Sequence, residues 1–104
     1  MEKNSKRYVA LTFLAKYQNG ACAKQIVEEN EKDLQNNGFN TRGKDGKLIT
    51  NSFNATLASM CENSTNTNEE KIFVCKKAKG AIYKDNVYTL YTINENGKHQ
   101  IEEN

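Results

Sequence analysis

Apolar residues recur at the period of an α-helix in the first two thirds of the chain. The pattern predicts three helices, over residues 5–17, 21–35 and 51–62. The second helix is expected to keep its acidic side chains on the solvated side. The residues expected in the core are apolar and lie on the inward side of each element: Val9, Phe13, Leu14, Ile26, Val27, Phe53, Leu57, Val74 and Leu90.

Beyond the helices the pattern changes to that of β-strands. Residues 71–75 and 86–93 are rich in Ile, Val, Phe, Tyr and Thr, and we expect them to pair as a hairpin across a lysine-rich connection. Three helices followed by a hairpin is the order of a winged helix-turn-helix, so the predicted fold is α+β with a C-terminal β-hairpin wing. In that architecture the third helix lies in the major groove of DNA, and the wing reaches phosphates or the neighbouring minor groove.

Several segments show no regular pattern. Residues 36–49 hold three glycines without an apolar period, which predicts a loop. Residues 63–70 are a polar linker of low complexity. We expect residues 1–4 to be a disordered N-terminus and residues 94–104 a flexible C-terminal tail, so that the winged-helix domain spans residues 5–93.

The formal net charge of +2 hides an uneven distribution of charge. Residues 25–37 carry four acidic side chains and one lysine, whereas residues 71–98 carry six lysines and two acidic side chains. One basic face is therefore expected, and basic faces attract phosphate. Lysine outnumbers arginine 13 to 2 and asparagine occurs 15 times, a bias that an AT-rich coding sequence also produces. Clusters of these residues are therefore better evidence for a binding site than single ones.

The cysteine pattern indicates a reducing compartment. Cys22, Cys61 and Cys75 lie far apart, form no C-x-x-C pair and are accompanied by a single histidine, so we expect reduced thiols in the core and no metal. The basic start and the apolar stretch 8–15 imitate a signal peptide and leave secretion as an alternative, although its removal would delete the first helix. No stretch approaches the length of a membrane span. We expect an intracellular protein of the nucleus or cytoplasm (nucleoid), without membrane contact.

Catalytic chemistry is not indicated by the residues. The single histidine, His99, lies in the expected tail, so no cysteine or serine has a plausible base. The glycines of the loop lack the order of a phosphate-binding P-loop, and no helix carries the carboxylate and histidine spacing of a metal site. We therefore predict a protein that is not an enzyme and uses no cofactor.

Four segments carry a family resemblance: “NGACAKQIVEEN”, “NNGFNTRGKDGK”, “FNATLASM” and “IFVCKKAKGAIYKDNVYTLY”. Together they resemble the HARE-HTH family, which consists of winged helices of chromatin factors, restriction-type proteins and a bacterial RNA polymerase subunit. Their joint spacing over about residues 11–91 carries the resemblance. It implies a winged-helix fold with a nucleic-acid or chromatin-associated role, and it brings no catalytic residues.

The candidate DNA-binding residues are cationic or uncharged and polar, and come from the third helix, the loop before it and the hairpin: Asn51, Ser52, Asn54, Arg42, Lys44, Lys47, Lys76, Lys77, Lys79, Tyr83 and Lys84. Asn51 and Asn54 are neighbours on one helical face and suit adenine, although capping and composition explain them equally well. Exposed turns favour lysine in any case. Tyr83 either stacks on a sugar or base or packs under the hairpin. Phosphate contacts should therefore dominate, with a weak or AT-leaning base preference.

Two functional interpretations remain open. The first is a transcription, chromatin or DNA-processing accessory factor that binds duplex DNA. The second is a winged helix that binds a protein partner as a subunit of a larger assembly, which the acidic second helix and the low net charge favour. A homodimer through the hairpin edge is compatible with either interpretation.

Overall fold

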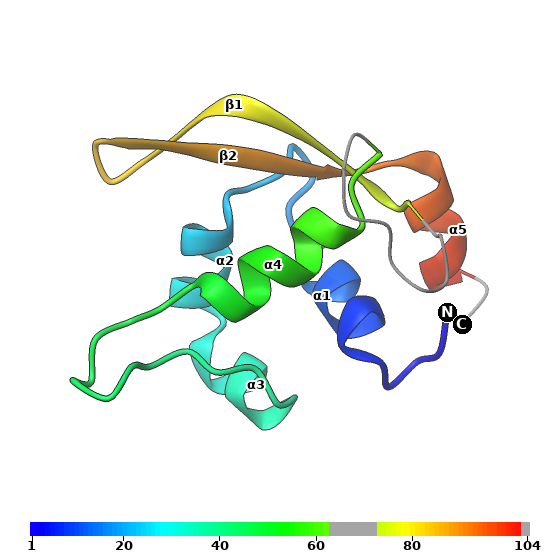
Figure 1. Cartoon of the computed structure of the whole chain (residues 1–104). Helices are drawn as coiled ribbons and strands as arrows, with labels where there is room; N and C mark the ends of the chain where they lie inside the picture. Colours follow the sequence, from blue (N-terminus) through cyan, green and yellow to red (C-terminus); the bar gives the residue numbers. More distant parts are fainter. Residues whose placement is uncertain (63–72, 103–104) are drawn as a thin grey trace.

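The computed structural model describes residues 1–62 and 73–102 of the chain. Within that part, four helices precede a two-stranded antiparallel hairpin and a fifth helix follows it, which confirms the α+β class. The elements in chain order are α1 (Lys6–Leu14), α2 (Ala23–Glu29), α3 (Glu31–Asn36), α4 (Asn51–Ser59), β1 (Cys75–Tyr83), β2 (Asn86–Ile93) and α5 (Glu95–Glu102). Figure 1 shows the hairpin along one side of the molecule, with α4 between the hairpin and α3. The linker predicted for residues 63–70 lies outside the described residues.

Helix α1 begins where the sequence predicts. Ser5 is its N-cap, and the Ser5 hydroxyl accepts a hydrogen bond of 3.1 Å from the Tyr8 backbone N–H. The helix ends at Leu14, earlier than expected, because the Tyr17 backbone N–H bonds to the Leu14 carbonyl in a tighter turn of three residues. Gly20, with φ of +83°, then turns the chain toward α2.

The predicted helix over residues 21–35 is interrupted at Asn30. The backbone there leaves helical geometry, with φ of −128° and ψ of 23°. The Asn30 side-chain amide donates to the Ile26 carbonyl at 2.9 Å and to the Tyr17 hydroxyl at 3.0 Å. Because such short polar side chains compete with the backbone for hydrogen bonds, the segment forms two short helices, α2 and α3.

The hairpin differs from the prediction in where its first strand lies. Of the strand expected at 71–75, residues 71 and 72 lie outside the described residues. The described strand begins at Cys75 and continues to Tyr83, so Lys76, Lys77 and Lys79 belong to the strand and not to the turn. Lysine, alanine and glycine have low strand propensity, but pairing with the apolar and aromatic residues of β2 overrides that preference.

A short backbone bridge ties the hairpin to the connection between α1 and α2. Ala21 and Tyr91 exchange two backbone hydrogen bonds, of 3.0 and 2.9 Å. A Cβ atom on Gly20 would lie 2.5 Å from the Tyr91 carbonyl oxygen, so the close approach requires glycine at this position.

Residues 95–102 form helix α5 where a flexible tail is expected over 94–104, and residues 103–104 lie outside the described residues. The Asn94 side chain accepts a hydrogen bond of 2.8 Å from the Gly97 backbone N–H, as an N-cap does, and its amide also donates to the Phe73 carbonyl. At the start of the chain, Met1 packs against the core, whereas the disorder of residues 1–4 stays a prediction. The packed unit therefore extends beyond residues 5–93.

The predicted core is largely confirmed. Seven of the nine expected residues are buried, whereas Val9 and Leu90 are only partly buried. On β2 the residue that points into the core is Tyr91, with 2% of its surface exposed. Since successive strand residues face opposite sides, a buried Tyr91 places Leu90 on the other face of the hairpin.

The three cysteines are free and buried, as expected of small core residues. The Cys61 and Cys75 sulfur atoms lie 3.3 Å apart, where α4 meets the start of β1. The shared hydrogen bond lowers the pKa of the Cys61 thiol and raises that of Cys75. In the described part of the chain, no helix is long and apolar enough to cross a bilayer.

Leu57→Ala should destabilise the protein by about 2–5 kcal/mol, since Leu57 is fully buried and the substitution leaves a cavity under the hairpin. Chemical denaturation measures the free energy of unfolding, with Lys44→Ala at an exposed loop position as the control. A loss below about 0.5 kcal/mol, which is typical of surface substitutions, would contradict the placement of α4 in the core.

Gly97→Ala should also destabilise the fold, by about 1–3 kcal/mol, because the added methyl group would meet the Val74 carbonyl oxygen and the Ile93 side chain. His99→Ala on the exposed side of the same helix is the matched control. Equal thermal unfolding midpoints for the two variants would show that α5 does not pack against the base of the hairpin.

Candidate nucleic-acid interface

The exposed side of α4 is uncharged. Asn51, Asn54 and Ala55 are exposed there, and we refer to these three residues as the α4 ridge. Ser52 is half-buried, and its backbone carbonyl accepts a hydrogen bond from the Thr56 hydroxyl at 3.0 Å. Short polar side chains without charge allow close approach of a polyanion, but they contribute no attraction to it by themselves.

Asn54 is held by the hairpin. The Tyr91 hydroxyl donates to Asn54 Oδ1 at 2.8 Å, and burial raises the pKa of Tyr91 to about 12, so this hydroxyl stays a donor at neutral pH. The bond fixes the orientation of the Asn54 amide and leaves Nδ2 without a protein partner among the described residues. Asn54 is therefore a positioned donor on the α4 ridge.

Lys76, Lys77 and Lys79 of β1 are exposed, and Lys76, which pairs with Thr92 on the other strand face, lines a hollow with Glu62 and Glu95. Lys76, Lys77 and Lys79 have no acidic group within 4.0 Å in the part of the chain that the structure describes. Lys77 pairs with Tyr91, and Lys79 pairs with Thr89, so both lie on the strand face that reaches Asn54. Thr89 and Asn54 also line one hollow of about 220 Å³ between the hairpin, α2 and the start of α4.

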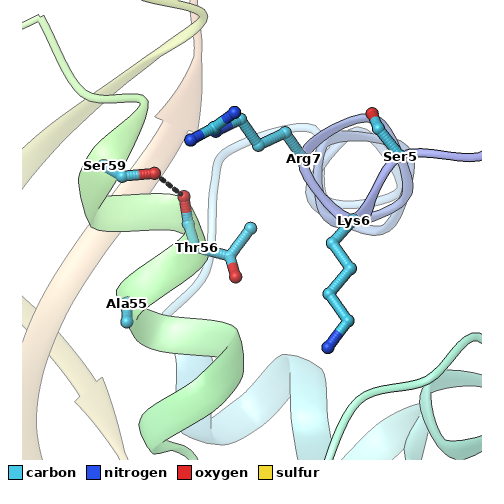
Figure 2. Close-up of a pocket in the computed structure, with 6 residues that line it drawn as sticks. All are labelled: Ser5, Lys6, Arg7, Ala55, Thr56 and Ser59. Carbon is cyan, nitrogen blue, oxygen red and sulfur yellow. Dashed lines mark hydrogen bonds between the residues drawn. The ribbon is translucent and has the colours of Figure 1, made fainter. Parts of the chain in front are cut away.

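Two further cations border α4 on its α1 side. Figure 2 shows Lys6 and Arg7 extending from the first turn of α1, across a hollow of about 320 Å³ from Thr56 and Ser59 of α4. The Lys6 ammonium lies 5.5 Å from the centre of the Phe39 ring. The α4 ridge therefore has basic side chains on both flanks, from the hairpin and from α1.

The loop cations do not act as one group. Arg42 donates two hydrogen bonds to the Glu31 carboxylate, at 2.7 and 2.8 Å, and a third to the Gly46 carbonyl. This bidentate pair fixes the loop to α3 and lowers the pKa of Glu31. Lys44 and Lys47 are exposed, but Figure 1 shows their loop on the side of α4 away from the hairpin. The loop lysines and the hairpin lysines thus lie on different sides of α4.

The tip of the hairpin is fastened to α2. The Glu28 carboxylate accepts hydrogen bonds from the Tyr83 hydroxyl at 2.6 Å and from the Lys84 ammonium at 2.7 Å. Lys84 and Asp85 form the two-residue turn, with φ of 48° and 66° as a type I′ turn requires. Tyr83 and Lys84, which are both among the predicted DNA-binding residues, are therefore bonded to Glu28 within the molecule.

The acidic side chains of α2 and α3 are also occupied. Glu29 accepts a hydrogen bond of 2.7 Å from the Tyr17 hydroxyl, and Glu28 and Glu31 accept the bonds from the hairpin tip and the loop. The acidic surface that the sequence indicates is therefore largely used inside the molecule.

Sequence reasoning missed Lys6 and Arg7 as neighbours of α4. Arg7 is one of only two arginines, which was an available signal, but its distance along the chain from α4 concealed the contact. Among the described residues, no three His, Cys, Asp or Glu side chains gather to hold a metal ion. No family model, curated protein or solved structure matches this chain.

The Glu28 carboxyl should titrate below its usual pKa of 4.5, because the Lys84 ammonium and then the Tyr83 hydroxyl stabilise its charged form. The attachment of the hairpin tip is then fully present above pH 4.5 and is lost as the pH falls through the lowered pKa of the folded state. An NMR pH titration should show the amide signals of Tyr83 and Lys84 moving with the Glu28 carboxyl carbon.

Glu28→Gln removes the titrating group, so the movement of those amide signals should disappear in this variant. Glu95→Gln is the control, since Glu95 is exposed and, within residues 1–62 and 73–102, forms an ion pair only with Lys98 of its own helix. A Glu28 carboxyl that titrates at or above 4.5 would show that the tip is not held by this acid.

Proposed function

We propose that this chain is a winged helix-turn-helix that binds duplex DNA, with α4 entering the major groove and the β1–β2 hairpin serving as the wing. The resemblance to HARE-HTH domains and the order of helices before the hairpin support this assignment. The additional helix α5 lies beside the base of the hairpin in Figure 1, apart from α4.

The observation that carries the proposal is the pair Lys77 and Lys79. Both are exposed, neither has an acidic partner among the described residues, and both lie on the strand face that contacts α4 through Tyr91. In contrast, Arg42 and Lys84 are paired with carboxylates. Cations without internal partners are available for phosphate, which supplies most of the affinity in protein–DNA complexes.

The proposed mode is backbone contact with little base reading. The α4 ridge offers no arginine or lysine for guanine, and it presents Asn54 with its Oδ1 already accepting from Tyr91. The remaining Nδ2 donor matches acceptors of several bases in the major groove. We therefore propose a weak sequence preference and an accessory role in transcription, chromatin or DNA processing, in a compartment that contains DNA.

A protein-interaction role is the alternative outcome. Its main support was the acidic second helix, but three of these acids bond within the molecule. The structure of the hairpin therefore favours DNA as the partner to test first.

The affinity for a duplex of about 20 base pairs should fall linearly with salt on a log–log plot, with a slope of about −0.9 for each neutralised phosphate. With the hairpin lysines and one or two cations of α1 or the loop engaged, a slope of about −3 to −4 is expected. Fluorescence anisotropy at several salt concentrations measures it. Lys77→Ala combined with Lys79→Ala should make the slope shallower by about one to two and weaken all sequences alike.

Lys32→Ala combined with Lys98→Ala removes the same net charge from α3 and α5 and should leave the slope within about half a unit of the wild-type value. If the wild-type protein shows no binding at about 50 mM salt and micromolar concentration, the DNA assignment fails and a protein partner becomes the better hypothesis. Equal slopes for the two double variants would show that the hairpin lysines make no phosphate contact.

A further inference from the structure

Two apolar side chains stand exposed at the end of the hairpin. Ile82 is 78% exposed and Val87 is 69% exposed, which makes them the exposed large hydrophobic residues of the described chain. The two residues are direct partners across the strands, so their side chains lie together on one face of the ribbon.

No residue in the described part of the chain covers this pair. Tyr83 follows Ile82 in the strand, so its side chain lies on the opposite face, and its hydroxyl bonds to Glu28 of α2. Because Lys84 bonds to the same carboxylate, the tip is held with its tyrosine face toward α2. Ile82 and Val87 lie on the other face, the one from which Tyr91 reaches α4 farther along the ribbon, and at the tip this face is open to solvent.

The apolar pair continues the basic face of the hairpin. One side of β2 carries every second residue, namely Val87, Thr89 and Tyr91. Their partners on β1 are Ile82, Lys79 and Lys77, respectively. A bulge with Gly80 at φ of +108° separates the lysines from the tip and increases the local twist. One ribbon face thus carries two cations that have no acidic partner among residues 1–62 and 73–102, followed by two exposed aliphatic side chains.

The small size of the pair decides which partner fits it. A stable contact between two proteins buries on the order of 1,200 Å² or more, which two aliphatic side chains do not supply. Proteins that bind the minor groove, by contrast, insert one or two apolar side chains, isoleucine among them, at a base step. Lysines on the same face match the phosphates that border the groove.

We propose that the Ile82 and Val87 pair enters the minor groove of duplex DNA as an apolar wedge, unstacking a base step and bending the duplex, while Lys77 and Lys79 hold the bordering phosphates. This inference rests on the proposed function and adds the part of the DNA that the hairpin tip contacts. The fastening of Tyr83 and Lys84 to Glu28 supplies the rigidity that a wedge needs.

The test uses the whole chain and a duplex of about 25 base pairs with a fluorescent donor and acceptor at its ends, so that bending raises energy transfer. The variant is Ile82→Thr with Val87→Thr, because threonine keeps a branched side chain suited to a strand and both sites are exposed. We expect energy transfer to rise with wild-type protein and not with the variant. The variant should bind about tenfold more weakly, with an unchanged salt slope.

The matched control exchanges the two residues, Ile82→Val with Val87→Ile, and should bend DNA as the wild type does. Netropsin bound in an AT-rich minor groove should weaken the wild type more than the threonine variant. Circular dichroism and thermal unfolding verify that all three proteins share one fold.

Each other outcome overturns the inference in a recognisable way. If wild type and threonine variant bind with the same affinity and neither bends the duplex, the wedge is absent. A salt slope that still depends on the lysines would then continue to support the proposed function. If the wild type sediments as a dimer and the threonine variant as a monomer, with equal DNA binding, the pair is a protein contact. If no duplex binds at all, the proposed function fails together with the wedge.

Discussion

Tyr91 is the residue on which the arrangement of the candidate site depends. Its backbone exchanges two hydrogen bonds with Ala21, its ring lies in the core, and its hydroxyl reaches Asn54 on α4. One residue thus joins the α1–α2 connection, the hairpin and α4. Since Lys77 is its partner across the strands, Tyr91 also determines where that cation lies relative to the α4 ridge.

Electrostatic pairing inside the molecule selects which cations remain available. Glu31 holds Arg42 and Glu28 holds Lys84, and both carboxylates keep a lowered pKa because of these partners. Exposed ion pairs of this kind add little to stability. Their larger consequence is positional, because they fasten the loop and the hairpin tip while the lysines in the middle of β1 stay unpaired among the described residues.

The hairpin combines rigidity with exposure. Its base is anchored by the Ala21 bridge and by Cys75, which is buried against α4, and its tip is anchored by Glu28. Between and beyond these points the ribbon presents lysines and then aliphatic side chains to solvent. A ribbon fixed at both ends loses little conformational freedom on meeting a partner, which favours a specific geometry of binding.

Periodicity and composition alone determined the α+β class, the Ser5 cap, the position of α4 and most of the core. These features follow from local hydrogen bonding and from which face of an element is apolar, and both depend on residues that are close in the sequence. Helix α5 is also predictable from the sequence, since Asn94 followed by an acidic first turn is a helix start signal. The polar composition of the tail obscured this signal.

The tertiary structure decided the register of the hairpin, the break at Asn30 and the division of the cations into paired and unpaired groups. Lys76, Lys77 and Lys79 lie in a strand because β2 pairs with them, against their own propensity. Lys84 and Arg42 are paired because Glu28 and Glu31 lie within reach, at separations of 56 and 11 residues along the chain. The local sequence around a residue does not indicate such distant partners, because folding brings them together through the packing of other elements.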